Sequence, residues 1–440
     1  MNLYNMRKLQ IFFLLIAATH LQAQTDSSKM QWFSDAKLGI FIHWGIYAVD
    51  GTSESWAFFN NQVPYSKYMQ QIKGFKAEKY NPKEWADLIK ESGARYTVIT
   101  SKHHDGVALW NTKMNDLSIP KMAPAKRDVL TPFVNEIRKN DIKVGIYYSL
   151  LDWSHPNYTG FRGDSSRYKI KDDTLRWNKF RQFYQGQINE LTLAYHPDLY
   201  WFDGDWEHSA AEWQSPLVRE KILSANPKAI INGRLQGFGD YETPEQNFPV
   251  SKPSNGNWEL CLTSNDNWGY RPSDHNFKTP YQIISIFADC ISMGGNLLLD
   301  IGPKADGTIP EEQVHLLKEL GKWTKQNEEA IFGTIAGLPQ GHFYGPSTLS
   351  KDSTVLYLFV AGTNAQNIYL KGLDNKILSA EILGSNQNLM PQIVGKISWS
   401  PVPGLVYFEI PETAKTTYMN VIKITLDKPL KLYRGKGGFN

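Results

Sequence analysis

The sequence contains very few cysteines: two in 440 residues, Cys261 and Cys290. This number excludes a disulfide-rich scaffold and a cysteine-ligated metal cluster, because both need several thiols. One bridge between the two is an alternative, but sparse cysteines in a large chain are most often buried free thiols. We therefore expect both to be buried and unpaired.

An excess of charge of either sign is also absent. Lys and Arg number 47 and Asp and Glu 44, which gives a formal net charge of +3 at pH 7. A nucleic-acid partner would need a basic patch or stripe, so no such partner is predicted. Hydrophobic residues at 41% and charged residues at 21% indicate a globular chain and exclude a disordered one.

No apolar run reaches the ~20 residues that a membrane-spanning helix needs. The apolar run at residues 11–18 follows Arg7 and Lys8 and precedes small residues near Ala23. This order is typical of a secretory signal peptide. We predict a signal peptide at residues 1–23, cleavage near Ala23, and an exported protein, periplasmic or secreted, without a membrane span.

Short apolar segments alternate with helical patterns from about residue 30 to 335. The strand candidates, each bounded by Gly, Pro or Asp, are Leu38–His43, Tyr96–Ser101, Val144–Ser149, Leu199–Phe202, Ala229–Asn232 and Leu297–Ile301. Helices are predicted from Pro82 to Gly93 and over Leu130–Ile137, Arg176–Tyr195 and Glu311–Asn327. Such alternation predicts an α/β fold with a parallel sheet.

A (β/α)8-like TIM barrel is the favoured closure of this sheet over 24–335, with an open doubly wound sheet as the alternative. No G-x-G-x-x-G follows the first strand, which weakens the dinucleotide-binding version of the open sheet. A barrel instead predicts polar residues at the carboxyl ends of its strands. His43, Asp203 and Arg234 occupy such positions.

The pattern changes near residue 335. The segments that follow are strand-like and separated by Gly, Asn, Asp and Pro: Thr354–Val360, Asn367–Leu370, Ser379–Leu383 and Val406–Ile410. No convincing helical pattern accompanies them. We predict a C-terminal antiparallel β-sandwich at residues 336–440, and we expect the chemistry in the barrel, where most of the tryptophans lie.

The first candidate catalytic group is Asp203, which ends a buried strand among aromatic residues. A carboxylate at a barrel mouth can act as nucleophile or base, although capping a helix or pairing with an Arg is the alternative. Retaining glycoside hydrolysis needs a second carboxyl ~5–5.5 Å away. Glu245, in a loop after a Pro, is preferred as this acid/base over Glu259, whose neighbours Trp258 and Leu260 favour burial.

Three histidines suggest a different kind of site, one that binds a metal. His43, His103 and His104 could bind a metal, but neither H-x-H nor H-E-x-x-H occurs, and adjacent histidines on a strand point to opposite faces. Hydrogen bonding to sugar hydroxyls fits better, because a neutral imidazole offers one donor and one acceptor. We therefore expect no metal. A Ser/His/Asp hydrolase is disfavoured because no G-x-S-x-G elbow is present.

Four ordered motifs resemble the α-L-fucosidases of glycoside hydrolase family 29. They are Gly39–Gly45 (GIFIHWG), Lys102–Gly106 (KHHDG), Gly145–Ser149 (GIYYS) and Trp201–Gly204 (WFDG). The resemblance covers roughly residues 30–335, and the β-sandwich after it also looks like that family. It implies exo-acting removal of terminal α-L-fucose from oligosaccharides or glycoconjugates, with retained configuration and no cofactor.

The resemblance also implies roles for single residues. Asp203 matches the nucleophile, while Glu245 and Glu259 match acid/base positions of different members. The residues matching sugar contacts, an active-site arginine and aromatic walls are His43, His103, His104, Tyr147, Arg234, Trp201 and Trp268. The family commonly has an adjacent Glu-Trp pair, whereas here Ser55 separates Glu54 from Trp56; we expect these two to do the same work.

Three alternatives stay open at this point. The chain could be a retaining barrel glycosidase for another sugar, or a catalytically decayed fucose-binding protein. Asp203 with two candidate acids argues against decay, because a pure binder needs none of these carboxyls. A metal-dependent hydrolase would lose activity on chelation.

Overall fold

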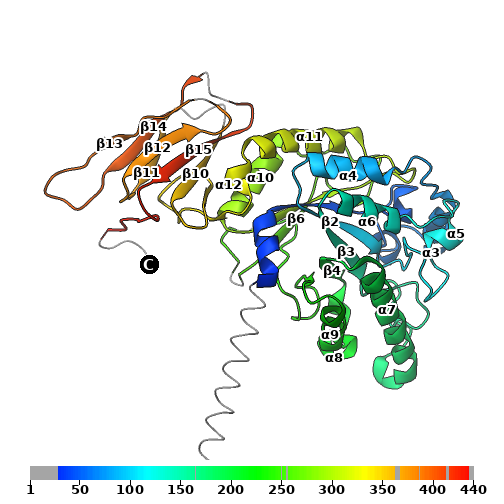
Figure 1. The fold of residues 1–440 in the computed structure, drawn as a ribbon. Coiled ribbons are helices and arrows are strands. Elements are labelled where there is room, and N and C mark those ends of the chain that lie inside the picture. The colour runs from blue at the N-terminus through cyan, green and yellow to red at the C-terminus, as the bar shows by residue number, and fades with distance from the viewer. Residues whose placement is uncertain are drawn as a thin grey trace, which may run out of the picture.

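The computed structural model describes residues 28–163, 165–248, 250–253, 256–361, 367–385, 387–412 and 416–435. The predicted signal peptide at 1–23 lies outside these ranges. Figure 1 shows a parallel sheet covered by helices in one part of the molecule and antiparallel sheets in the other. The predicted fold class, a barrel followed by a sandwich, is confirmed.

The parallel sheet has seven strands in the order β5-β4-β3-β2-β1-β7-β6. Their bounds are β1 (Leu38–Ile42), β2 (Tyr96–Lys102), β3 (Lys143–Ser149), β4 (Leu199–Asp203), β5 (Ile230–Ile231), β6 (Glu259–Thr263) and β7 (Asn296–Ile301). All six predicted strands are present. β6 was not predicted, because its buried run is short and begins with a Glu.

An irregular segment closes the barrel between β5 and β6. Single parallel bridges join Tyr241 to Asn232, just after β5, and Glu245 to Cys261 in β6. Residues 241–245 thus lie where a regular eighth strand would lie, and the curled sheet has hydrogen-bonded neighbours on both sides of the gap. This segment brings the side chain of Glu245 to the barrel wall.

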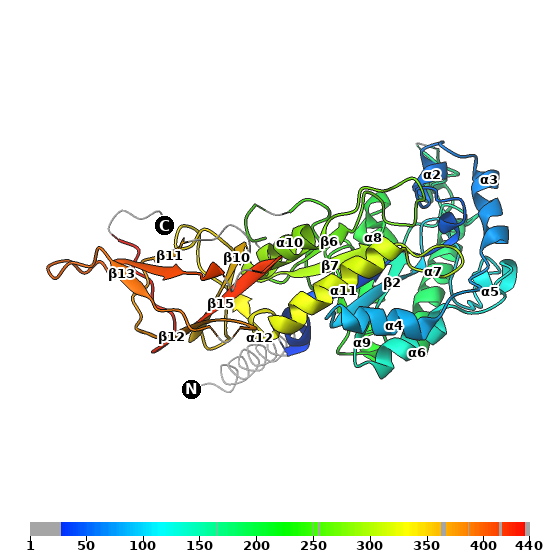
Figure 2. The ribbon, with the colours of Figure 1, turned by 90° about the horizontal axis from the view of Figure 1, so that it is seen from above.

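Helices follow the strands, and the longer ones cover the outside of the barrel. They are α2 (Trp56–Phe59), α3 (Tyr65–Gln70), α4 (Pro82–Glu91), α5 (Ile119–Met122), α6 (Leu130–Lys139), α7 (Thr174–Tyr195), α8 (Ala210–Trp213), α9 (Ser215–Ala225), α10 (Pro280–Ser292), α11 (Glu311–Gln326) and α12 (Glu328–Ile331). Asn81 caps α4 by accepting from the backbone N–H of Lys83 and Glu84. The four predicted helices are present as α4, α6, α7 and α11. Figure 2 shows α4 and α11 side by side along the barrel.

The interior of the barrel is filled with side chains. Phe41, Tyr147 and Trp201 belong to one buried cluster with Met30 and Phe33 of the helical residues 28–36. Inward-facing residues of a barrel form a packed core rather than a pore. Access for a ligand is therefore from the carboxyl ends of the strands.

The C-terminal part is a sandwich of two antiparallel sheets, ordered β12-β15-β10-β9-β8 and β11-β14-β13. The strands are β8 (Ile335–Ala336), β9 (Ser347–Leu349), β10 (Val355–Ala361), β11 (Asn367–Lys371), β12 (Ile377–Ile382), β13 (Gln392–Val394), β14 (Leu405–Glu409) and β15 (Met419–Leu426). The four predicted strands correspond to β10, β11, β12 and β14. Trp323 of α11 donates to the carbonyl of Met419 at 2.9 Å, which joins sandwich and barrel. The division at residue 335 stays a prediction and falls on β8.

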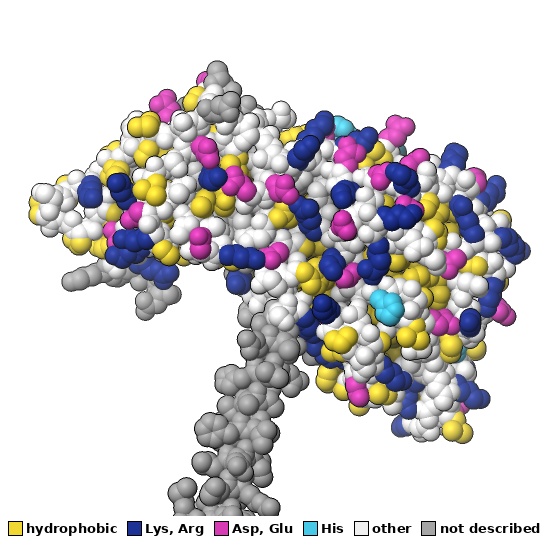
Figure 3. Space-filling model, in the orientation of Figure 1, with side chains coloured by type: hydrophobic (Ala, Val, Ile, Leu, Met, Phe, Trp, Pro, Cys, Tyr) yellow, Lys and Arg dark blue, Asp and Glu magenta, His cyan; other side chains and the backbone are white. Residues whose placement is uncertain are grey.

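The cysteines, the lack of a membrane-spanning helix and the balance of charge were also predicted from the sequence. Cys261 and Cys290 are buried and free, as expected. Within the described ranges, no helix is long and apolar enough to cross a membrane. Figure 3 shows side chains of both charge signs interspersed on the face in view, in keeping with the small net charge.

Candidate active site

Asp203 lies at the mouth of the barrel as the last residue of β4. Side chains alternate along a strand, so Trp201 and Asp203 share the inward face. The Asp203 carboxylate accepts a hydrogen bond from the Tyr147 hydroxyl at 2.8 Å and one from Arg234 Nη1 at 2.9 Å. His104 Nε2 lies 3.6 Å from the same carboxylate. With 8% of its surface exposed, Asp203 is held in place yet open to a ligand.

Arg234 links two carboxylates. Its Nη1 donates to Asp203, its Nη2 donates to Glu245 Oε2 at 2.6 Å, and its Nε donates to Thr243 Oγ1 at 3.1 Å. The guanidinium lies over the ring of Trp201, 4.5 Å from the centroid. Burial alone would lower the pKa of Arg234, but the two carboxylates raise it, so the group stays charged.

The two candidate acids occupy different environments. Glu245 belongs to the closing segment, and its side chain is 40% exposed beside Arg234. Glu259 is the first residue of β6 and fully buried, where it accepts hydrogen bonds from the Tyr96 hydroxyl and from Trp201 Nε1 at 3.0 Å. Tyr96 begins β2, so this contact lies at the amino end of the strands, away from the mouth. Burial raises the pKa of Glu259 to about 7.

Each of the three histidines has a separate partner for its Nδ1 atom. The pairs are His43 with Asp300 at 2.7 Å, His103 with Ser55, and His104 with Ser149 at 2.6 Å. Burial lowers the pKa of all three well below the ordinary value, so the rings are neutral at neutral pH. Within the part of the chain that the structure describes, no three His, Cys, Asp or Glu side chains are grouped to hold a metal.

The segment Glu54–Trp56, in which Ser55 is the extra residue, also lies at the mouth of the barrel. Glu54 accepts from the backbone N–H of Gly269 at 2.7 Å, and burial raises its pKa to about 7. Trp268, next to Gly269, packs against His43 with 5.0 Å between ring centroids. Trp56 lies edge-on to His104 at 5.5 Å. The intervening Ser55 is the residue that bonds His103, so the insertion has a role of its own.

Sequence reasoning missed several residues of this site. Asp300 was passed over, although it lies near the carboxyl end of a predicted strand, the same signal that singled out Asp203. Thr243 orients Arg234, and Trp206 lies edge-on to His104 at 6.0 Å. Each lies close in sequence to a predicted site residue, Thr243 to Glu245 and Trp206 to Asp203, but its contact with Arg234 or His104 depends on the fold.

The chain is similar in sequence to known proteins. The family model described as Alpha-L-fucosidase matches residues 16–329. The tissue α-L-fucosidase of Macaca fascicularis is 30% identical over 406 residues, which cover 84% of this chain and 82% of that protein. The α-L-fucosidase of Branchiostoma floridae is 31% identical over 335 residues, 69% of this chain and 72% of that protein.

Solved structures are similar over nearly the whole chain. The α-L-fucosidase isoenzyme 1 from Paenibacillus thiaminolyticus superposes with a TM-score of 0.83 at 29% identity, covering 92% of this chain and 100% of that one. A family 29 α-L-fucosidase from Bacteroides thetaiotaomicron, trapped as a covalent intermediate, gives a TM-score of 0.80 at 26% identity, covering 91% and 96%. The chain therefore belongs to the α-L-fucosidases of glycoside hydrolase family 29.

Proposed function

We propose that this glycoside hydrolase removes terminal α-L-fucose from oligosaccharides or glycoconjugates by a retaining double displacement, with Asp203 as nucleophile and Glu245 as acid/base. The observation that supports it most is the shared guanidinium of Arg234, which contacts both carboxylates at the open end of the barrel. A trapped covalent intermediate in the Bacteroides thetaiotaomicron relative fits the same two-step chemistry.

In the first step, an Asp203 oxygen attacks the anomeric carbon and the bond to the leaving oxygen breaks. The Glu245 carboxyl gives its proton to that oxygen, so the aglycone leaves as a neutral alcohol. Tyr147 and Arg234 hold Asp203 from two sides and fix the direction of attack. A covalent fucosyl ester on Asp203 results.

In the second step, Glu245 acts as the base. It takes a proton from a water molecule, whose oxygen attacks the anomeric carbon and displaces Asp203 as a carboxylate. The ion pair with Arg234 fits the ionised form of Glu245 that this step requires. Two inversions leave the configuration of the sugar unchanged.

Glu259 suits a supporting role better than that of acid/base. Both of its oxygens accept from buried donors, Tyr96 and Trp201, and Glu259 and Tyr96 are the first residues of their strands. A proton donor must reach the leaving oxygen directly or through one water. Glu259 instead fixes the Trp201 ring on which Arg234 rests.

The remaining site residues suit the binding of a deoxysugar. His43, His103 and His104 are neutral, so each ring can offer hydrogen bonds to hydroxyls. Trp56 and Trp268 provide apolar ring faces for the C5 methyl group. We further propose export through a signal peptide at 1–23, a catalytic part at 24–335 and a sandwich at 336–440.

The test is hydrolysis of 4-nitrophenyl α-L-fucoside by the wild type and by Asp203→Ala, Glu245→Ala and Glu259→Ala, with and without azide. We expect no turnover from Asp203→Ala. Azide should rescue Glu245→Ala with a glycosyl azide of retained configuration. Asp205→Ala is the matched control carboxylate, because Asp205 bonds the backbone N–H of Gln236 instead of the catalytic pair. Full activity of a folded Asp203→Ala would refute the mechanism, and rescue of Glu259→Ala would reassign the acid/base.

A further inference from the structure

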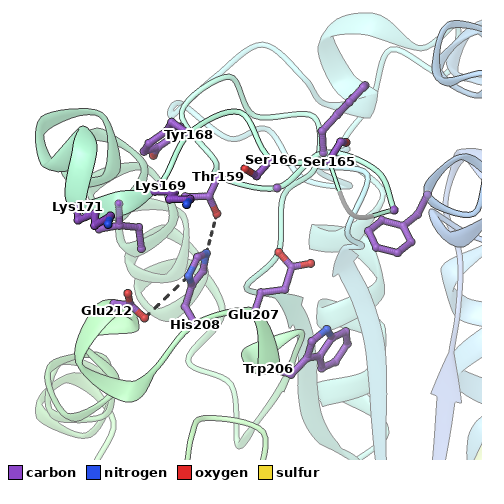
Figure 4. A pocket seen from close by; sticks show the side chains of 15 residues that line it. Thr159, Ser165, Ser166, Tyr168, Lys169, Lys171, Trp206, Glu207, His208 and Glu212 are labelled. Carbon is purple, nitrogen blue, oxygen red and sulfur yellow. Dashed lines mark hydrogen bonds and ion pairs between the residues drawn. The ribbon is translucent and has the colours of Figure 1, made fainter.

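A cavity with a volume of about 650 Å³ is lined in part by Trp206, and its lining side chains are drawn in Figure 4. One wall comes from the loop after β3, including Thr159 and Lys169, and the other from the segment after β4, including Trp206, Glu207 and His208. This volume is in the range of ordinary small-ligand sites. The mechanism proposed above does not use the cavity.

Trp206 connects the cavity to the nucleophile. It lies in the short turn η4 (Asp205–Glu207), and 51% of its surface is exposed. Its ring is edge-on to His104, with 6.0 Å between centroids, and His104 Nε2 is 3.6 Å from Asp203. A ring parallel to it, Trp56, lies 6.3 Å away. A ligand group on Trp206 would therefore adjoin the sugar held at Asp203.

Glu207 is a fixed hydrogen-bond acceptor in this cavity. Oε1 accepts from Trp153 Nε1 at 3.1 Å and Oε2 accepts from the Tyr158 hydroxyl at 2.5 Å, and both aromatic side chains are buried. Each carboxylate oxygen can accept more than one hydrogen bond, so acceptor capacity remains. Figure 4 shows the Glu207 carboxylate directed into the cavity. A group already held in place loses little entropy on binding a ligand.

Residues of both walls can donate hydrogen bonds. His208 Nε2 and Thr159 Oγ1 are 2.8 Å apart, and burial lowers the pKa of His208 to about 4, so the ring is neutral at neutral pH. Lys169 lines the cavity and is exposed, and among the described residues it forms no ion pair. Donors, acceptors and an aromatic face together match a sugar ring, whose hydroxyls both donate and accept.

We propose that this cavity binds the neutral hexose to which fucose is attached, with Trp206 as the stacking face, Glu207 as acceptor and Lys169 as donor. The proposal rests on the proposed fucosidase function and adds the class of leaving group. A hexose here makes contacts that a small aryl leaving group does not make. The residues of the cavity therefore affect turnover of fucosyl oligosaccharides selectively.

The test compares kcat/KM for 4-nitrophenyl α-L-fucoside and for a neutral fucosylated lactose. Glu207→Gln and Lys169→Ala are expected to lower kcat/KM for the fucosylated lactose about tenfold each, the usual effect of losing a hydrogen bond to a charged group. Both variants should keep aryl fucoside turnover within about twofold, which also shows that they fold. Lys179→Ala removes the same charge from an exposed position of α7 outside the cavity. It should leave kcat/KM unchanged for both substrates.

The outcomes separate the two proposals. Equal losses on both substrates, or none on the fucosylated lactose, would overturn the cavity assignment while leaving the fucosidase function intact. Wild-type turnover of the aryl fucoside but not of the fucosylated lactose would do the same. A wild type inert on both would overturn the function, and the cavity assignment with it.

Discussion

Arg234 and Asp203 form the central ion pair of the site, with Arg234 Nη1 donating to Asp203 Oδ1 at 2.9 Å. The same guanidinium reaches Glu245 and Thr243 through its other nitrogens. A planar guanidinium presents its N–H groups in fixed directions, so it can serve three acceptors at once. One side chain thereby sets the spacing between the two carboxylates proposed for catalysis.

Replacing the planar guanidinium of Arg234 by a flexible ammonium group should impair catalysis. For Arg234→Lys we expect kcat/KM on 4-nitrophenyl α-L-fucoside to fall by about 10- to 100-fold, because one or two hydrogen bonds to charged groups are lost. Arg219→Lys is the control, since Arg219 of α9 pairs with Asp240 instead of Asp203 or Glu245. Wild-type kcat/KM in a folded Arg234→Lys protein would contradict the role assigned to the guanidinium.

Asp300 should act as a positioning residue for His43. Its Oδ1 holds His43 Nδ1 at 2.7 Å and fixes the ring that faces the sugar site. Asp300→Ala is expected to weaken competitive inhibition by L-fucose about tenfold, and Asp300→Asn, which keeps an acceptor, should restore most of the loss. Inhibition by L-fucose that is equally weak in both variants would indicate a general disturbance of the fold instead.

Glu259→Gln should change the pH dependence of stability. The folded pKa of Glu259, about 7, lies above its ordinary value of 4.5, so the native state binds the proton more tightly than the unfolded state. The wild type therefore loses stability as pH rises from about 4.5 through 7, by about 3 kcal/mol at most for this group. The neutral amide removes this loss. Urea unfolding of both proteins at pH 4.5 and pH 8 measures the difference, and a gap that does not widen with pH would refute the prediction.

Chelation should leave activity unchanged. The three histidines direct Nδ1 to Asp300, Ser55 and Ser149 separately, so the arrangement does not favour a shared metal. We expect turnover of the aryl fucoside to be the same before and after dialysis against EDTA. A loss that added zinc or calcium reverses would favour the metal-dependent hydrolase that the sequence left as an alternative.

Most strands of the barrel could be predicted from local sequence patterns. The buried runs at Leu38–Ile42 and Leu199–Asp203 are short, apolar and bounded by turn residues, so the strands were predictable. β6 was not predicted because its first residue, Glu259, is a buried carboxylate, and local sequence patterns place carboxylates at the surface. The sandwich strand β15 was missed as well, although it pairs with both β10 and β12. Its place between β10 and β12 is a property of the sheet and not of the segment.

Some residues of the site could likewise be predicted from local patterns, and others could not. Asp203 and the histidines lie in short motifs at strand ends, where the topology of a parallel barrel places functional groups. Asp300 also lies near the carboxyl end of a strand, β7, so the same rule identifies it as a candidate site residue. The Ser55 contact with His103 depended on where the inserted residue points, which sequence spacing does not specify.

The sequence by itself determined the α/β class, the order of barrel and sandwich, the family and the position of Asp203. Periodicity and short motifs are local, and they carry this information without knowledge of distant contacts. Only the tertiary structure decided that Glu245 shares Arg234 with Asp203 while Glu259 lies buried beneath Trp201. That difference depends on which face of the closing segment and of β6 each carboxylate occupies. Pairing across the barrel sets those faces, because it alone brings residues that are far apart in the chain to hydrogen-bonding distance.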